Sequence, residues 1–159
     1  METYMAWQAL DGVTGHDMGR LLLRQLYEAY VGGEMPALCI APKGKPYFAD
    51  SPWHFSISHT KHYAFCVLSD RSVGVDAEEL ARKVRPSIAS KILSPGEYEQ
   101  YQQADDPQRA LLSFWVLKEA TAKQTGEGIR IHPNHTDFSL PDQRVQQVGP
   151  CLVAIVHEQ

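Results

Sequence analysis

A long helix between two strong boundary signals constrains the fold of this chain most tightly. Asp106 is a favourable N-cap, Pro107 suits the first helical position, and Gly126 is typical of a helix end. Leucine, tryptophan and valine side chains between them recur near the 3.6-residue period. The sequence therefore predicts a helix over residues 107–125.

Charged side chains lie beside the apolar stripe of this predicted helix. Trp115, Glu119 and Lys123 are spaced four residues apart, which places them along one side. A carboxylate and an ammonium next to a core-facing indole lose water, which is costly without partners. One interpretation is a solvated Glu119–Lys123 pair on the surface; the other is a functional site. The choice between them depends on a second group of carboxylates upstream.

That second group lies in a predicted strand over residues 73–78. A strand repeats every two residues, so Asp76 and Glu78 project from the same face. Two neighbouring negative charges repel each other unless a cation or a basic group offsets them. A hard divalent ion with oxygen ligands is one solution, and Glu119 could supply a third carboxylate. An exposed pair on a strand face is the alternative.

The rest of the chain is predicted to mix helices with short strands. The capping box of Ser94 and Glu97 starts a helix that ends near residue 103. Two further helices are expected over about residues 14–31 and 86–93, and strands over about 37–40, 55–59, 63–68, 73–78, 136–140 and 151–157. Short turns join the three strands within residues 55–78, which predicts an antiparallel meander.

Composition excludes several classes of protein. The 15 basic and 19 acidic residues give a net charge of −4, so we expect no nucleic-acid partner. No leader sequence and no long apolar run is present, so we expect no membrane span. Cys39, Cys66 and Cys151 are far apart and predict free thiols in a reducing cytoplasm. His132 and His135 have metal-like spacing but no partner motif, so we predict a loop.

Four short motifs follow one another in an order that is more specific than any one of them. They are Gly44-Lys45-Pro46, Phe-Ser-Ile-Ser-His at 55–59, Val-Gly-Val-Asp-Ala-Glu at 73–78, and Trp-Val-Leu-Lys-Glu-Ala-Thr-Ala-Lys at 115–123. In this order the chain resembles the 4′-phosphopantetheinyl transferases of the Sfp-like branch, from about residue 22 to residue 128. The resemblance implies an α+β fold of antiparallel sheets with packed helices. It also implies one domain of two pseudo-symmetric lobes, about 1–80 and 81–159, with coenzyme A between them.

The resemblance further implies an activity and a catalytic group. Such enzymes transfer 4′-phosphopantetheine from coenzyme A to a serine of an acyl or peptidyl carrier protein and release 3′,5′-ADP. Asp76, Glu78 and Glu119 match the positions that hold Mg²⁺ with the pyrophosphate. Glu119 is the expected general base, and Lys123 would offset charge on the leaving oxygens. Glu97 matches a glutamate suspected of helping to deprotonate the serine.

Five residues match positions that bind coenzyme A. Three of them correspond to contacts with the 3′-phosphate end, namely Lys45, Ser58 and His59. Lys118 belongs to the matching W-x-x-K-E motif, and Lys123 should reach the pyrophosphate. The chemistry needs alignment and neutralised charge more than an enzyme nucleophile.

The chain also departs from the family pattern. Ala77 replaces a bulkier aliphatic residue, and Thr60 follows the histidine where serine is common. The segments before the first helix and after Gly128 have room for fewer strands than usual. A monomer is favoured, with completion by a partner surface as the alternative. A second functional hypothesis is an inactive relative that binds coenzyme A or a carrier protein without transfer.

Basic residues just after the Asp76–Glu78 strand have two interpretations. Arg82, Lys83 and Arg85 could meet the acidic helix by which carrier proteins normally dock. They could equally form a solvated turn.

Overall fold

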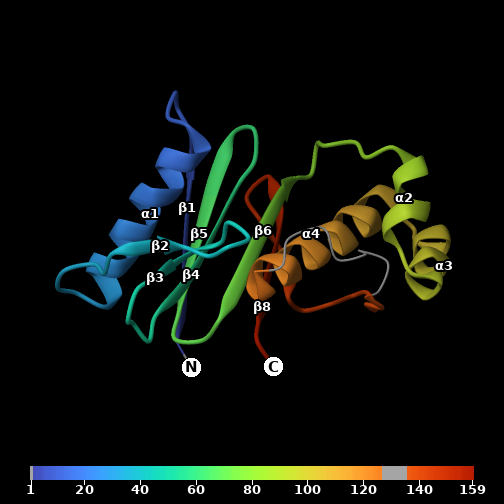
Figure 1. Cartoon of the computed structure of the whole chain (residues 1–159). Helices are drawn as coiled ribbons and strands as arrows, with labels where there is room; N and C mark the ends of the chain where they lie inside the picture. The colour runs from blue at the N-terminus through green and yellow to red at the C-terminus, as the bar shows by residue number, and fades with distance from the viewer. Residues whose placement is uncertain (1, 127–135) are drawn as a thin grey trace.

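Two three-stranded antiparallel sheets form the centre of the molecule (Figure 1). The computed structural model describes residues 2–126 and 136–159. Helix α1 packs on the N-terminal sheet and α4 on the C-terminal sheet, while α2 and α3 lie beyond α4. The predicted α+β class, with antiparallel sheets and packed helices, is confirmed.

The N-terminal sheet has the strand order β1-β5-β4. Its elements are β1 (Thr3–Ala9), β4 (His54–His59) and β5 (Tyr63–Ser69), with α1 (Gly15–Tyr30) packed against them. Thr14 caps α1 through Asp17 N, and leucines of the helix bury against β5. The helix and two of the strands were predicted. Strand β1 was not, because it is a half-exposed edge strand defined by its pairing with β5 rather than by alternation.

A short hairpin lies next to this sheet. It consists of β2 (Leu38–Ile40) and β3 (Pro46–Phe48), which pair antiparallel around the turn that contains Gly44 and Lys45. Gly44 has a φ of +93°, which a residue with a side chain rarely adopts. Lys45 Nζ donates to the carbonyl of Gln124 at 3.0 Å, so the turn is fastened to the end of α4.

The C-terminal sheet contains the strand with the two acidic residues. It has the order β6-β8-β7, formed by β6 (Val73–Glu79), β8 (Cys151–His157) and β7 (Val145–Val148). The predicted meander is therefore wrong for its third strand, because β6 pairs with β8 and not with β5. The chain passes from the N-terminal sheet to the C-terminal sheet between β5 and β6. This point comes before residue 80, near which the lobe boundary was predicted.

Two serine side chains join the sheets where β4 lies beside β6. Val75 N donates to Ser56 Oγ at 3.0 Å, and Ala77 N donates to Ser58 Oγ at 3.2 Å. Hydroxyl groups of β4 thus accept the amide hydrogens of β6 that face it. These polar backbone groups are satisfied although the two strands share no ladder. We call this boundary the β4–β6 seam.

Three helices connect β6 to the last strands. They are α2 (Pro86–Ile92), α3 (Pro95–Gln103) and α4 (Pro107–Thr125), and they agree closely with the predicted ranges. Ser94 and Glu97 form the predicted capping box, and Gly126 ends α4 in the left-handed conformation. Within the described residues, none of the helices has the length and apolar character needed to cross a bilayer.

The predicted strand over residues 136–140 is wrong. Phe138 N donates to Glu97 Oε2, and Leu140 N donates to Gln100 Oε1, each at 2.8 Å. Side chains of α3 therefore take the backbone donors that a strand would give to a neighbour. The predicted loop at His132 and His135 lies outside the described residues.

All three cysteines are free. Cys66 lies in the N-terminal sheet and Cys151 in the C-terminal sheet, and both are 0% exposed. Burial raises the pKa of the Cys66 thiol and raises that of Cys151 to about 11.

Candidate active site

Asp76 stands at the centre of the site, in the middle of β6. Its Oδ1 accepts hydrogen bonds from Lys123 Nζ at 3.2 Å and from Ser58 Oγ at 3.3 Å. Its Oδ2 is buried and has no hydrogen-bond partner among the described residues. Burial raises the pKa of Asp76 to about 6, although the positive charge of Lys123 acts in the opposite direction.

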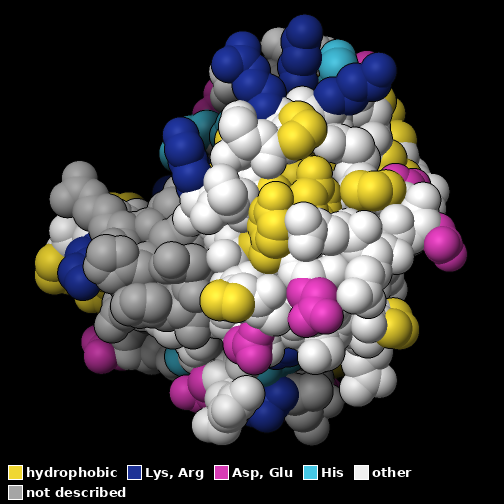
Figure 2. All heavy atoms as spheres, turned by 90° about the vertical axis from the view of Figure 1, so that its right-hand side faces the viewer, with side chains coloured by type: hydrophobic (Ala, Val, Ile, Leu, Met, Phe, Trp, Pro, Cys, Tyr) yellow, Lys and Arg dark blue, Asp and Glu magenta, His cyan; other side chains and the backbone are white. Residues whose placement is uncertain are grey.

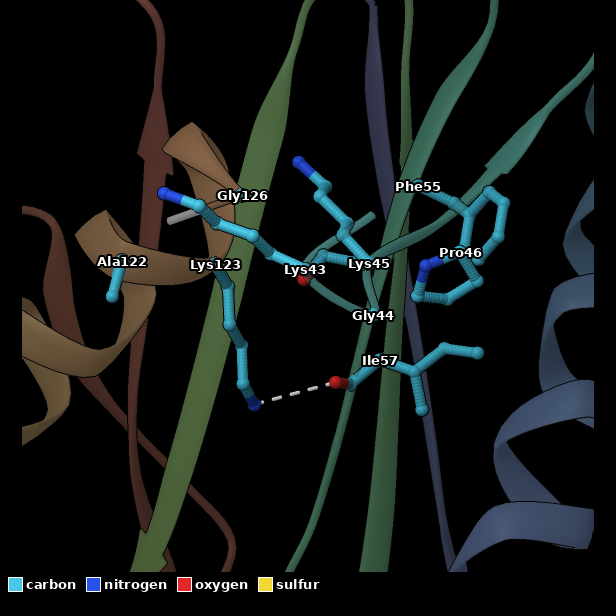
Figure 3. Close-up of a pocket in the computed structure, with 10 residues that line it drawn as sticks. Lys43, Gly44, Lys45, Pro46, Phe55, Ile57, Ala122, Lys123 and Gly126 are labelled. Atoms are coloured by element: carbon cyan, nitrogen blue, oxygen red, sulfur yellow. Dashed lines mark hydrogen bonds between the residues drawn. The ribbon is translucent and has the colours of Figure 1, made fainter. Parts of the chain in front are cut away.

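Helix α4 brings two more charged groups to Asp76. The helix crosses β6 at Gly74, where an added Cβ would lie 2.0 Å from the carbonyl oxygen of Ala120. This close approach places Glu119 and Lys123 over the strand. Lys123 Nζ also donates to the carbonyl of Ile57 at 3.3 Å, so the ammonium spans the β4–β6 seam (Figure 3).

The Glu119 carboxyl group is electrostatically coupled to the two acids of β6. Burial and, to a smaller extent, the nearby charges of Asp76 and Glu78 raise its pKa to about 7, against the effect of Lys123. A carboxyl group that titrates near neutrality can accept a proton from a substrate hydroxyl.

Glu78 is held from two sides at the edge of the group. Arg82 Nη1 lies 2.7 Å from Glu78 Oε1, and Trp115 Nε1 donates to the same oxygen at 3.2 Å. The guanidinium carbon of Arg82 lies 5.9 Å from the centre of the Trp115 ring. The indole beside Glu119 thus has a partner that the helical spacing did not reveal.

A pocket of about 260 Å³ opens on one side of Asp76, between the hairpin turn and the end of α4. Figure 3 shows Lys43 and Lys45 on the turn and Lys123 on the helix around this pocket. Lys45 is half-buried and burial lowers its pKa. It also donates to the carbonyls of Gln124 and Val73, at 3.0 and 3.4 Å.

The predicted contacts Ser58 and His59 point to different surroundings. Ser58 is 4% exposed and bonds inward to Asp76 and Ala77. His59 is exposed and packs on Gly15 at the start of α1, where an added Cβ would lie 2.3 Å from the ring. A second hollow of about 610 Å³ begins at His59 and extends to Arg82. The site thus has two hollows along β4, one lined by Lys123 and the other by Glu78.

The structure does not bring Glu97 and Lys118 to this group. Glu97 is 0% exposed and accepts hydrogen bonds from Ser94 N, Lys118 Nζ and Phe138 N. Lys118 is also buried, 2.7 Å from Glu97, and it donates to Thr136 Oγ1 as well. Among the described residues, both side chains are enclosed by α3, α4 and the segment from Thr136 to Phe138. The buried pair joins α3 to α4 away from Asp76, and the predicted catalytic role of Glu97 and coenzyme A contact of Lys118 stay predictions.

The acidic residues are the candidate ligands for the divalent cation that the resemblance implies. No three His, Cys, Asp or Glu side chains already converge as a metal site within residues 2–126 and 136–159. The donor chemistry nevertheless fits Mg²⁺, which prefers carboxylate oxygens. Asp76 Oδ2 is a buried acceptor that lacks a hydrogen-bond partner among the described residues, and burial with the neighbouring acids raises the pKa values of Asp76 and Glu119.

Comparison with known proteins agrees with this geometry. The sequence pattern of the 4′-phosphopantetheinyl transferase superfamily matches residues 72–154, more than half of the chain. This chain belongs to that superfamily. The match begins just before β6 and ends within β8, so it contains Asp76, Glu78, Glu119 and Lys123.

Three curated members of the superfamily illustrate the similarity. The 4′-phosphopantetheinyl transferase HetI of Nostoc sp. is 34% identical over 125 residues, which is 70% of this chain and 51% of HetI. The 4′-phosphopantetheinyl transferase of Bacillus subtilis is 30% identical over 126 residues, 69% of this chain and 53% of that protein. A holo-[acyl-carrier-protein] synthase of Yersinia pestis is 39% identical over 64 residues, 36% of this chain and 51% of that protein. The chain spans about half the length of the curated relatives it matches.

Two residues that set the packing of the elements around this site escaped the sequence reasoning. A glycine inside a strand often marks close approach of another backbone, and Gly74 has that role. Ser56 alternates with Ser58 on β4, but its bond to Val75 depends on which strand lies beside β4. The sequence therefore contained a signal for the close approach at Gly74, but no signal for the contact between Ser56 and Val75.

Proposed function

We propose that this protein transfers the 4′-phosphopantetheine group of coenzyme A to a serine of an acyl or peptidyl carrier protein. The observation that carries the proposal is the buried Oδ2 of Asp76, which has no hydrogen-bond partner among the described residues and is set among Lys123, Glu119 and Glu78. Three acids and an ammonium at one seam suit a reaction at a pyrophosphate more than simple binding.

Coenzyme A would lie along the β4–β6 seam. Lys45, with Lys43 on the same turn, offers positive charge for the 3′-phosphate end, and His59 flanks the second hollow. Lys123 is near enough to Asp76 to accompany a pyrophosphate bound there. Asp76, Glu119 and Glu78 would hold Mg²⁺, which supplies charge neutralisation to the phosphates when bound.

The chain's own residues account for the movement of the proton and the leaving group. The serine oxygen forms a bond to the phosphorus of the phosphopantetheine group, while the bond from that phosphorus to the bridging oxygen breaks. Glu119 accepts the serine proton as the general base of the site. Lys123 offsets the negative charge that develops as 3′,5′-ADP leaves.

The carrier protein would approach the end of the molecule next to Glu78. Arg82, Lys83 and Arg85 are exposed between β6 and α2. Figure 2 shows Lys and Arg side chains gathered at one end of the face formed by α2 and α3, above a hydrophobic patch. This arrangement supports docking of an acidic helix. We also propose a monomer, and the free cysteines support a cytoplasmic location.

The intact mass of an apo carrier protein tests the proposal. The carrier is incubated with this protein, coenzyme A and Mg²⁺, with EDTA in a parallel sample. We expect a gain of one phosphopantetheine that EDTA prevents. No gain with any of several acyl and peptidyl carriers, together with measurable binding of coenzyme A, would overturn transfer in favour of a binding protein.

A further inference from the structure

Two serines of β4 make nearly the same contact across the seam. Ser56 is 6% exposed and accepts from Val75 N; Ser58 is 4% exposed and accepts from Ala77 N. The donors flank Asp76 on either side in the sequence. As supports for β6, the two hydroxyl groups are therefore equivalent.

The two serines differ in the hydrogen bond that the hydroxyl group donates. Ser58 Oγ donates its hydrogen to Asp76 Oδ1 at 3.3 Å, whereas Ser56 is not a partner of Asp76 within the described residues. Ser58 thereby connects the backbone of β6 to the carboxylate on the same strand. Both hydrogen-bonding functions of this hydroxyl group are occupied inside the protein, away from the surface.

The orientation of Asp76 follows from this contact. Oδ1 receives Ser58 and Lys123, so rotation of the carboxylate would break two hydrogen bonds at once. Oδ2 is buried and has no partner in the part of the chain that the structure describes, which is unfavourable unless a ligand satisfies it. Such an oxygen needs a support that prevents the carboxylate from turning away.

We propose that Ser58 is a positioning residue for Asp76, whose hydroxyl group holds Oδ1 so that Oδ2 stays directed at a divalent cation. This inference rests on the proposed function, because it assigns the cation to that same site. It gives Ser58 a role different from the phosphate contact that the family resemblance implied. Residues that orient a metal ligand typically change metal affinity by about tenfold to a hundredfold when they are removed.

Ser58→Ala and Ser56→Ala form a matched pair for the test. Each removes one acceptor for an amide of β6, and only Ser58→Ala also frees Asp76. Mn²⁺ serves as the probe, and its binding to the whole chain in the presence of coenzyme A is followed by the EPR signal of the free ion. Binding of coenzyme A in EDTA is measured separately for each variant.

We expect Ser58→Ala to weaken Mn²⁺ binding at least about tenfold, while Ser56→Ala binds Mn²⁺ as the wild type does. Coenzyme A affinity in EDTA should stay unchanged in both, and Ser58→Thr, which keeps the hydroxyl group, should restore Mn²⁺ binding. Ser58→Cys, with a weak donor of similar size, provides a second variant if Ser58→Ala does not fold.

Equal Mn²⁺ affinity in the two alanine variants would overturn the positioning role. A loss of coenzyme A affinity in EDTA by Ser58→Ala alone would overturn it as well and restore the phosphate contact. These outcomes leave the proposed function standing when the wild type still modifies carrier proteins. A wild type that binds Mn²⁺ normally but transfers nothing would overturn the proposed function instead.

Discussion

Lys118 Nζ lies 2.7 Å from Glu97 Oε1, and the side chains of this ion pair are 6% and 0% exposed. The pair joins α4 to α3 away from Asp76. Lys118→Met leaves the Glu97 carboxylate buried without its cation. We therefore expect the free energy of unfolding to fall by about 3–5 kcal/mol, measured by denaturant unfolding.

The Arg144–Asp142 pair provides the control for Lys118→Met. It has the same N–O distance of 2.7 Å, but Arg144 is 36% exposed. Arg144→Met should therefore cost no more than about 1 kcal/mol. Wild-type stability of Lys118→Met together with lost transfer would contradict the structural role and favour a contact with coenzyme A.

Gly74→Ala should destabilise the packing of α4 on β6. The new methyl group meets the backbone at the Ala120 carbonyl and at Gln124 N, 2.0 and 2.5 Å away, and backbone cannot rotate aside. We expect a loss of at least about 1–3 kcal/mol in denaturant unfolding and weaker Mn²⁺ binding, because Glu119 and Lys123 move with the helix. An unchanged free energy of unfolding would show that the helix does not cross here.

Stability without metal should depend on pH through Asp76 and Glu119. Their pKa values are about 6 and about 7, whereas carboxyl groups of the unfolded chain titrate near about 4. Between these values the folded protein binds more protons than the unfolded chain, so the free energy of unfolding falls as pH rises.

Glu119→Gln isolates this effect from other titrating groups. In EDTA the variant should gain stability over the wild type as pH rises from about 5 to about 8, followed by Tm. Saturating Mg²⁺ should reduce the advantage, because it stabilises only the carboxylate. A constant Tm difference across this range would show that the folded protein does not raise the pKa of Glu119.

Lys45→Ala should weaken binding of coenzyme A, measured by calorimetry. The ammonium lies at the pocket between the hairpin and α4, where it can share its carbonyl contacts with a phosphate. The comparison ligand is 3′-dephospho-coenzyme A, which lacks the group that Lys45 is proposed to meet. The loss should be large for coenzyme A and small for this ligand. Equal losses would instead indicate that Lys45→Ala disturbs the hairpin.

Asp76→Asn and Glu119→Gln should each abolish transfer while the protein stays folded. Both changes preserve shape and remove one negative charge from the proposed metal site, and Glu119→Gln also removes the base. Intact mass of the carrier reports transfer, and circular dichroism reports folding. Near-normal turnover by either variant would refute its role.

Local chemistry explains which elements could be predicted from the sequence. Ser94, Glu97, Asp106 and Gly126 act on their own helix ends, so those boundaries agree with the structure. Strand partners are different, because the alternation over residues 73–78 is the same whichever strand lies beside it. The pairing of β6 with β8 joins residues about half of the chain apart in sequence and left no local signal.

The same distinction separates the predictions about the site. Helical and strand periods placed Glu119 beside Lys123 and Asp76 beside Glu78, and the packing at Gly74 brought these pairs together. No helical or strand period in the sequence relates Glu97 to the other residues of the site. The packing of α3 on α4 sets its environment, in which Glu97 is a buried partner of Lys118.

Cys66 and Cys151 give each sheet its own chemical reporter. Because both thiols are buried and carry raised pKa values, a thiol reagent can reach either one only after its sheet opens. The labelling rate of Cys66 therefore measures how fast the sheet of β1, β4 and β5 opens. The labelling rate of Cys151 measures how fast the sheet that carries the acidic residues opens. A comparison of the two labelling rates therefore shows whether the two halves unfold as one cooperative unit.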